Sequence, residues 1–365
     1  MKIECKIEKI KHGISKMDRI AGKNLTLPIL DSFLLIVKGS TLKIRATNLS
    51  IGVEVEIPVK VLEEGVVAIR GDIFSQTISS MNDNDVLILE ALGENLKLKT
   101  KNSSITIKSF PSEDFPTIPS VSGTSFSVSS SKLLDGIKSV YYSGAISDIK
   151  PEISSTYVYG DGDSLIFVAT DSFRLAEKKI KTKNIEEFPG IIIPFKNISE
   201  IIKILADESA DVIVTISKNQ MSLSLDGVYL TSRIVDGVFP DYKQIIPKEF
   251  KTEIVVLKQD LINALKVSNV FSDKFNQITL LVKPKEKTMA IFSKNSEIGE
   301  NTTNITASLS GENAEVSFNH KYLTDCLQSI NQDSISIQLN QNTKPMIIKG
   351  ISDQSFSYLI MPMNK

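Results

Sequence analysis

The sequence predicts an α+β protein that contains one structural unit three times, and three observations predict it. The same order of segments (helix, strands, helix, strands) recurs with a period of about 125 residues, long enough for each copy to be a domain. Apolar residues within each copy recur at spacings of three and four and elsewhere alternate with polar residues. Proline and glycine cluster between the copies. We therefore expect three domains, at residues 1–120, 121–245 and 246–365.

Two amphipathic helices are expected in each copy, because apolar residues at these spacings share one helical face. The first helices are indicated by Ile10, Ile14, Met17 and Ala21; by Leu134, Ile137 and Tyr141; and by Leu261, Leu265 and the run up to Phe271. The second helices are indicated by Phe74, Ile78 and Met81; by Ile198, Ile201, Ile202 and Leu205; and by Leu323, Leu327 and Ile330.

Strands are expected between and after these helices. The runs are residues 33–37, 42–45, 86–89, 156–159, 165–168, 212–215, 278–282, 289–292, 335–338 and 356–360. The joints between paired runs are rich in glycine, aspartate and proline, which favour tight turns. One of them, Gly160–Asp163, is better explained as a hairpin turn than as a calcium loop, because too few ligands follow it.

Composition sets limits on the class of protein. Hydrophobic residues make up 41% of the 365 positions, enough for a full core. No apolar run is long enough to span a membrane, and the N-terminus alternates like a strand and lacks a signal-peptide core. Cys5 and Cys326 are expected to be reduced, buried residues of a cytoplasmic protein.

Charge gives the first functional indication. The net charge of −1 argues against nucleic-acid binding unless basic residues gather on one surface. Lys9, His12, Lys16, Arg19 and Lys23 are spaced so that a helix would place them in one stripe, apart from its apolar face. The stripe is either an ordinary solvated face or a surface toward phosphates. Base-stacking aromatics do not interleave with it, which favours sequence-independent contact with duplex DNA.

Catalysis has little support in the sequence. The two histidines, His12 and His320, have no cysteine or carboxylate nearby at metal-ligand spacing. Nucleotide-binding and nucleophile motifs are absent, and Asp83 with Asp85 is more typical of a solvated turn than of a two-metal site. We expect no catalytic residue, no metal and no cofactor.

The stretch Ala169–Ala176 is the most informative part of the chain. A buried strand ends there, and a polar turn is followed by Phe173, Arg174 and Leu175. Such a strand end can form the wall of an apolar pocket with a charged rim. Alternatively, it is a hairpin whose aromatic side chain packs into the local core.

This stretch, Ala-Thr-Asp-x-x-Arg-Leu-Ala, resembles the central motif of the bacterial replicative sliding clamp, the beta subunit of DNA polymerase III. Three further stretches match that family in order, Thr26–Leu30, Asp236–Tyr242 and Met361–Met363, so the resemblance covers the whole chain. It implies three repeated helix-and-antiparallel-sheet domains in a crescent. Two crescents would close head to tail into a homodimeric ring with helices inside.

The resemblance also implies a function. The ring would encircle double-stranded DNA and act as a non-catalytic processivity factor. It would hold the replicative polymerase, the clamp loader and repair proteins through short peptide motifs. Two rival hypotheses are a non-enzymatic scaffold that binds proteins but never DNA, and an enzyme of unknown substrate. Salt-dependent retention on circular but not linear DNA separates the scaffold from the clamp.

Site residues follow from the resemblance position by position. The partner-peptide pocket would comprise Thr170, Ser172, Phe173, Arg174, Leu175, Pro240, Ile245, Leu359, Met361, Pro362 and Met363. For DNA-facing residues the resemblance implies Lys23 and Lys196, and the basic stripe adds Lys9, Lys16 and Arg19. The dimer interface would use Phe74, Ile78, Met81, Val270, Phe271 and Phe275, which could equally be intradomain core.

The chain departs from the family pattern at the pocket. Ser172 and Phe173 stand where members commonly have glycine with histidine or tyrosine, and Gln244 stands where an arginine is frequent. The preferred peptide is therefore expected to differ.

Overall fold

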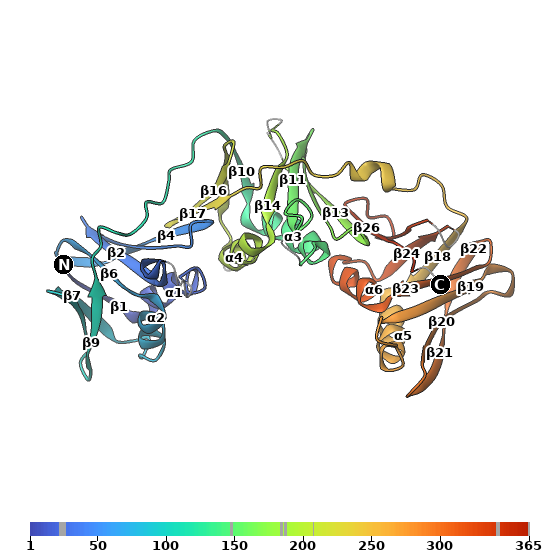
Figure 1. Cartoon of the computed structure of the whole chain (residues 1–365), viewed down its shortest axis with the longest axis horizontal. Coiled ribbons are helices and arrows are strands. Elements are labelled where there is room, and N and C mark those ends of the chain that lie inside the picture. Colours follow the sequence, from blue (N-terminus) through green and yellow to red (C-terminus); the bar gives the residue numbers. More distant parts are fainter. Residues whose placement is uncertain are drawn as a thin grey trace. The chain divides into compact units, whose positions relative to one another are not determined.

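The computed structural model describes residues 1–21, 27–146, 149–182, 185, 188–206, 208–340 and 344–363. The chain divides into two compact units (Figure 1). Unit 1 comprises Met1–Ser131 with Lys196–Ile234, and unit 2 comprises Lys132–Phe195 with Val235–Lys365. Each unit contains its own sheets and core.

Six α-helices lie within the described ranges. They are α1 (Ile7–Ser15), α2 (Gly71–Ser79), α3 (Ser130–Val140), α4 (Phe195–Ala206), α5 (Lys258–Val270) and α6 (His320–Cys326). Helices α1 and α2 lie next to each other in unit 1, as α5 and α6 do in unit 2 (Figure 1).

Unit 1 is built on one antiparallel sheet of 13 strands, in the order β10-β15-β16-β17-β4-β3-β2-β6-β9-β8-β7-β1-β5. Its strands are β1 (Lys2–Lys6), β2 (Ser32–Lys38), β3 (Thr41–Thr47), β4 (Ile51–Pro58), β5 (Lys60–Glu63), β6 (Gly65–Arg70), β7 (Val86–Leu92), β8 (Asn95–Lys99), β9 (Ser104–Phe110), β10 (Thr124–Ser129), β15 (Asp211–Ile216), β16 (Gln220–Leu225) and β17 (Val228–Arg233).

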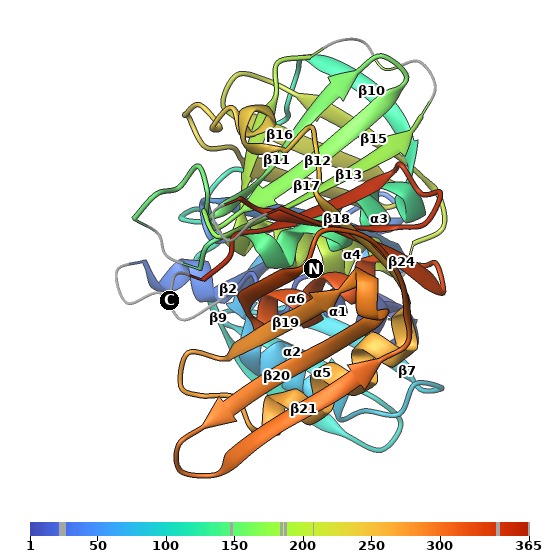
Figure 2. The ribbon, with the colours of Figure 1, turned by 90° about the vertical axis from the view of Figure 1, so that its right-hand side faces the viewer.

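Unit 2 has a sheet of nine strands, β14-β11-β12-β13-β26-β25-β24-β18-β22, and one of four, β21-β20-β19-β23. Its strands are β11 (Ser155–Asp161), β12 (Ser164–Thr170), β13 (Arg174–Lys181), β14 (Ile191–Pro194), β18 (Thr252–Leu257), β19 (Gln277–Lys283), β20 (Thr288–Asn295), β21 (Gly299–Ile305), β22 (Ala307–Gly311), β23 (Ala314–Asn319), β24 (Ser334–Leu339), β25 (Met346–Gly350) and β26 (Phe356–Ile360). Figure 2 shows β21 at the free edge of the four-stranded sheet.

The threefold repeat is confirmed, with one change at its start. Each copy begins with a strand, not with its first helix, and that strand pairs with the strand after the second helix: β1 with β7, β10 with β15 and β18 with β24. The copies also contain more strands between their helices than the sequence predicts, because short or polar strands give a weak alternation signal. All ten expected runs lie within strands, and Gly160–Asp163 is part of a hairpin, as expected.

Helix α1 is shorter than predicted. It ends at Ser15, and Met17 and Ile20 are buried by turns that continue after it. Gly13 lets the helix approach strand β4, since a Cβ atom there would lie 2.8 Å from the Ile57 side chain. Arg19 is therefore in a turn, and Lys23 lies outside the described residues. The expected single helical stripe of basic residues is wrong.

Both cysteines are free and buried, as expected. Burial raises the pKa of the Cys5 thiol to about 12 and raises that of Cys326 as well, so both stay protonated near neutral pH. Within the described ranges, no helix combines the length and the apolar character needed to cross a membrane.

Gly136 in α3 tests the packing of unit 2. An added Cβ atom would lie 2.4 Å from Cε2 of the fully buried Phe167. Alanine favours a helix by about 1 kcal/mol over glycine, but overpacking costs roughly 1–3 kcal/mol. We expect Gly136→Ala to lower the free energy of unfolding, measured by urea denaturation, and exposed Lys138→Ala to leave it nearly unchanged. Higher stability of Gly136→Ala would contradict the close packing.

Candidate functional site

A tight turn between β12 and β13 displays one aromatic side chain. The Thr170 hydroxyl donates to the backbone oxygen of Arg174 at 2.6 Å. Oδ1 of Asp171 accepts from the backbone N–H groups of Phe173 and Arg174, at 2.9 and 3.0 Å. These bonds close the turn and leave the Phe173 side chain 61% exposed. The alternative in which this aromatic packs into the local core is therefore wrong.

Ser172 is the residue of this turn whose backbone conformation is strained. Its φ angle is +77°, in the left-handed region that favours glycine. This is the position where the family commonly has glycine. The chain thus keeps the turn geometry with a less suitable residue.

Arg174 does not form the expected charged rim, because its side chain is only 7% exposed. Its guanidinium pairs with Asp171 at 2.9 Å and with Asp325 at 2.6 Å. Burying an arginine requires such partners, since an unpaired buried charge is costly. The sequence predicts a free arginine here because Asp325 is 151 residues away.

The C-terminal strand runs beside this turn. β26 pairs with β13 from Arg174↔Ile360 to Lys178↔Phe356. After the strand ends, the Met361 N–H donates to the Phe173 backbone oxygen at 2.8 Å. The segment Met361–Met363 is half-buried. The pairing thus brings two predicted parts of the pocket together.

An apolar cluster joins the same region to the segment after β17. We call it the linker cluster; its buried members are Ile166, Val168, Leu175, Ile192, Phe239, Tyr242 and Leu359. The half-buried Met361 and Ile246 pack against it. Residues from the central motif, the Asp236–Tyr242 motif and the C-terminus therefore share one core.

Aromatic contacts fix the linker in this cluster. The ring of Phe239 stacks on Tyr157 with 4.7 Å between centroids. The Tyr242 hydroxyl lies 2.9 Å from that of Tyr159 and donates to Glu177. Burial, and then the hydrogen bond to Glu177, raise the pKa of Tyr242, so it remains a neutral donor. Tyr157, Tyr159 and Glu177 were missed from sequence: the two tyrosines were predicted only as ordinary strand positions, and nothing in the sequence singled out Glu177.

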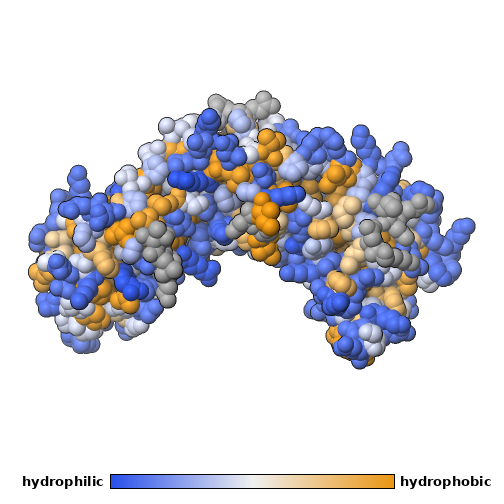
Figure 3. Space-filling view, viewed as in Figure 1, coloured by the Kyte–Doolittle hydropathy of each residue, from blue (hydrophilic) through white to orange (hydrophobic). Residues whose placement is uncertain are grey.

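The predicted pocket residues divide by exposure. Thr170, Leu175 and Leu359 are buried, and Ser172, Phe173, Pro240 and Ile245 are exposed. Gln244 is neutral, and its side-chain amide donates to Asp241 at 2.7 Å. The position where arginine is frequent therefore carries no positive charge here. On the face in Figure 3, hydrophobic residues are interspersed with hydrophilic ones. Buried leucines close in the fold to an exposed aromatic would suit an apolar peptide side chain.

The predicted DNA-facing residues do not form one free basic surface. Lys9, Arg19 and Lys196 are exposed. Lys16 is 4% exposed and pairs with Glu208 within unit 1, so its expected role in an open stripe is corrected. Lys203 pairs in the same unit with Asp18.

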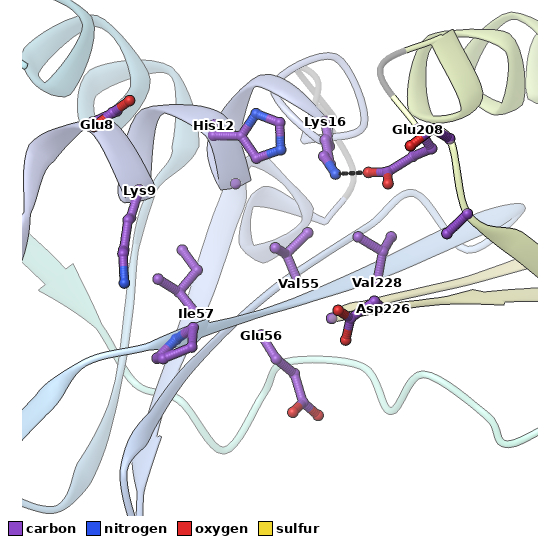
Figure 4. A pocket seen from close by; sticks show the side chains of 15 residues that line it. Glu8, Lys9, His12, Lys16, Val55, Glu56, Ile57, Glu208, Asp226 and Val228 are labelled. Atoms are coloured by element: carbon purple, nitrogen blue, oxygen red, sulfur yellow. Dashed lines mark hydrogen bonds and ion pairs between the residues drawn. The ribbon is translucent and has the colours of Figure 1, made fainter.

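Lys16 and Glu208 line a cavity of about 560 Å³ in unit 1. Figure 4 shows Glu8, Lys9 and His12 on α1 and Lys16 just after its end, with Val55, Ile57 and Val228 across from them and Glu56 and Asp226 on the far side. Glu56 pairs with Lys43. Four carboxylates and two lysines line the cavity, so acidic groups outnumber basic ones there and make it a poor anion site.

Two predicted dimer residues belong to the core of unit 1. Phe74 and Ile78 are 0% and 1% exposed, and the Phe74 ring meets Phe33 edge to face with 6.5 Å between centroids. Their side chains have no surface to offer a partner, so that expectation is corrected in favour of intradomain core. Val270 and Phe275 are 61% and 58% exposed, whereas Met81 and Phe271 are half-buried.

Three α+β repeats whose neighbours share sheet edges, with the linker cluster at the second join, point to a clamp. The chain belongs to the DNA polymerase III beta subunit family. The family's N-terminal, central and C-terminal domain models match residues 1–119, 127–241 and 243–364. It is thus a ring-type processivity factor and not an enzyme by itself.

Individual relatives agree with this assignment. The chain is 27% identical to the beta sliding clamp of Synechococcus elongatus, over 100% of this chain and 99% of that protein. It resembles the structure of a Pseudomonas aeruginosa DnaN sliding clamp bound to griselimycin, with a TM-score of 0.96, 24% identity and full coverage of both chains. For the Thermotoga maritima beta subunit the TM-score is 0.93 and the identity 26%, over 100% of this chain and 99% of that one.

The strained Ser172 gives a direct test of the turn. Glycine adopts a positive φ without penalty, while a residue with a Cβ loses roughly 1 kcal/mol there. We expect Ser172→Gly to raise the thermal unfolding temperature and Ser172→Val to lower it. If the two variants unfold at the same temperature, the left-handed geometry of this turn is contradicted.

Proposed function

We propose that Phe173, Ile245 and the Met361–Met363 segment form the partner-peptide site of this clamp, over the floor made by Thr170, Leu175 and Leu359. Ser172 and Pro240 complete its surface. The observation that carries the proposal is the linker cluster, in which three segments far apart in sequence meet. Methionine side chains adapt to varied apolar ligands, which suits a site with several partners.

The ligands of this site are short peptide segments of the replicative polymerase, the clamp loader and repair proteins. Exposed Phe173, Val238 (88% exposed) and Ile245 support an apolar anchor in the ligand. The missing positive charge at Gln244 favours peptides with a less acidic flank than those preferred when arginine is there.

Griselimycin is a suitable probe, because a related clamp structure contains it. We expect Phe173→Ala combined with Met363→Ala to weaken griselimycin binding at least tenfold, the effect of losing an interaction of about 1.4 kcal/mol. Calorimetry provides the measurement. Ile213→Ala removes a similarly exposed apolar side chain from β15 and is the matched control, with unchanged affinity. Equal affinity of the double variant and the wild type contradicts the pocket.

We propose that two copies close head to tail around duplex DNA. Strand β21 is a sheet edge, and the described residues provide no second neighbour for Ser104–Lys108 of β9. Free edges of this kind pair readily with another chain. Exposed Val270 and Phe275, with Phe271 and Met81, would bury apolar surface beside that pairing.

DNA is then held by topology, and Lys9, Arg19 and Lys196 need to supply only weak, salt-screened attraction to phosphates. Lys23 belongs to this proposal through the family resemblance alone. The domain limits 1–120, 121–245 and 246–365 are supported by the family-model matches. The free, buried thiols support a cytoplasmic location.

Ring closure is tested by Val270→Asp combined with Phe275→Asp. Two carboxylates in an apolar contact should convert the dimer to a monomer, measured by light scattering at micromolar concentration. Wild-type protein placed on circular DNA by its clamp loader should remain bound at 0.5 M salt until the circle is cut, and the variant should not be retained. Retention of the wild type on linear DNA, or a dimeric variant, contradicts closure by this surface.

A further inference from the structure

All three nitrogen atoms of the Arg174 guanidinium contact other groups of the protein. Nε pairs with Asp171 at 2.9 Å, and Nη1 pairs with Asp325 at 2.6 Å. Nη2 donates to the backbone oxygen of Tyr142 at 2.6 Å, and the guanidinium carbon lies 4.4 Å from the centre of the Tyr322 ring. We call Arg174 with these four residues the arginine bracket.

The bracket connects the turn that displays Phe173 to α6. Asp325 and Tyr322 lie on α6, in the region matched by the C-terminal domain model, and Arg174 lies in the region matched by the central one. All are in unit 2. Further contacts accompany the bracket: the Ser329 hydroxyl lies 3.1 Å from both the Ser139 backbone oxygen and the Tyr142 hydroxyl.

Asp171 has two tasks in this arrangement. Its Oδ2 pairs with the guanidinium, while its Oδ1 holds the N–H groups of Phe173 and Arg174 and so sets the turn. Asp325 supplies the second negative charge. If Asp325 loses that charge, Asp171 alone must compensate a buried guanidinium, and its side chain can no longer serve both the turn and the arginine equally well.

We propose that Arg174 is a positioning residue that couples partner-peptide binding to the packing of α6. Its side chain is almost fully buried, so it acts on the peptide through the turn. It holds the Phe173 turn through Asp171, and α6 holds Arg174 through Asp325 and Tyr322. The inference rests on the proposed peptide site and adds two residues, Asp325 and Tyr322, that the predicted residue set does not include.

Coupling of this kind is reciprocal. If the packing of α6 strengthens peptide binding, a bound peptide must stabilise the packing of α6 by the same factor. If the role of Arg174 were purely structural, a bound peptide would not have to stabilise α6, because Arg174 would affect stability whether or not a ligand is bound. Protection of α6 by ligand is therefore the distinguishing measurement.

The test uses the full-length protein with griselimycin as ligand. Asp325→Asn keeps the shape of the side chain and removes its charge, and we expect it to weaken griselimycin binding about tenfold, the size typical of a coupling between sites. Asp325→Glu should restore part of the affinity. Lys321→Ala changes an exposed residue of the same helix and should bind as the wild type does. Arg174→Lys keeps the positive charge but should bind griselimycin more weakly than the wild type, because lysine cannot form the same fork of hydrogen bonds.

Hydrogen exchange of α6 completes the test. Griselimycin should slow exchange in α6 of the wild type and of Lys321→Ala, and not of Asp325→Asn. Unaltered exchange of α6 in the ligand-bound wild type overturns the coupling even if a variant fails to fold. Weaker binding by Phe173→Ala with wild-type binding by Asp325→Asn overturns the coupling but keeps the peptide site. Wild-type affinity in both variants overturns the peptide site itself.

Discussion

The antiparallel pairing of β13 with β26 is the interaction on which the candidate site depends. It aligns Leu175 with Leu359, and both become part of the linker cluster. Because the backbone ladder continues past the strand end, through the bond from Met361 to Phe173, the C-terminal segment is carried to the edge of the turn. A site formed from the middle and the end of the chain therefore needs no special loop. The pairing register of β13 with β26 brings the two segments together.

The same principle operates in unit 1, where β17 pairs with β4 from Val228↔Val55 to Ser232↔Ile51. Sharing sheet edges satisfies backbone groups that would otherwise be exposed. Side-chain hydrogen bonds also connect residues on either side of this pairing. Asn197, for example, donates to Ser232 at 2.8 Å and to the Ser50 hydroxyl at 3.1 Å.

Several basic residues form internal ion pairs, among them Lys16, which was predicted from the sequence to face DNA. Lys16 and Lys203 pair with acids of unit 1, and Arg174 pairs with acids of unit 2. Cations that pair internally are not available to contact phosphates. Weak attraction suits a ring, since retention by topology permits movement along the duplex while strong contacts would oppose it.

The sequence by itself determined the repeat, the strand runs, the family and the segments that meet at the candidate peptide site. These depend on periodicity and local turn chemistry, which a chain carries in short stretches. Only the tertiary structure decided the roles of individual side chains. Phe74 lies on a regular apolar stripe whether the stripe faces its own core or a partner, and periodicity cannot separate the two. Arg174 pairs with Asp325, 151 residues away, besides its neighbour Asp171, and Lys16 pairs with Glu208, 192 residues away. A pairing at such a distance is fixed by the folded register and not by neighbouring residues.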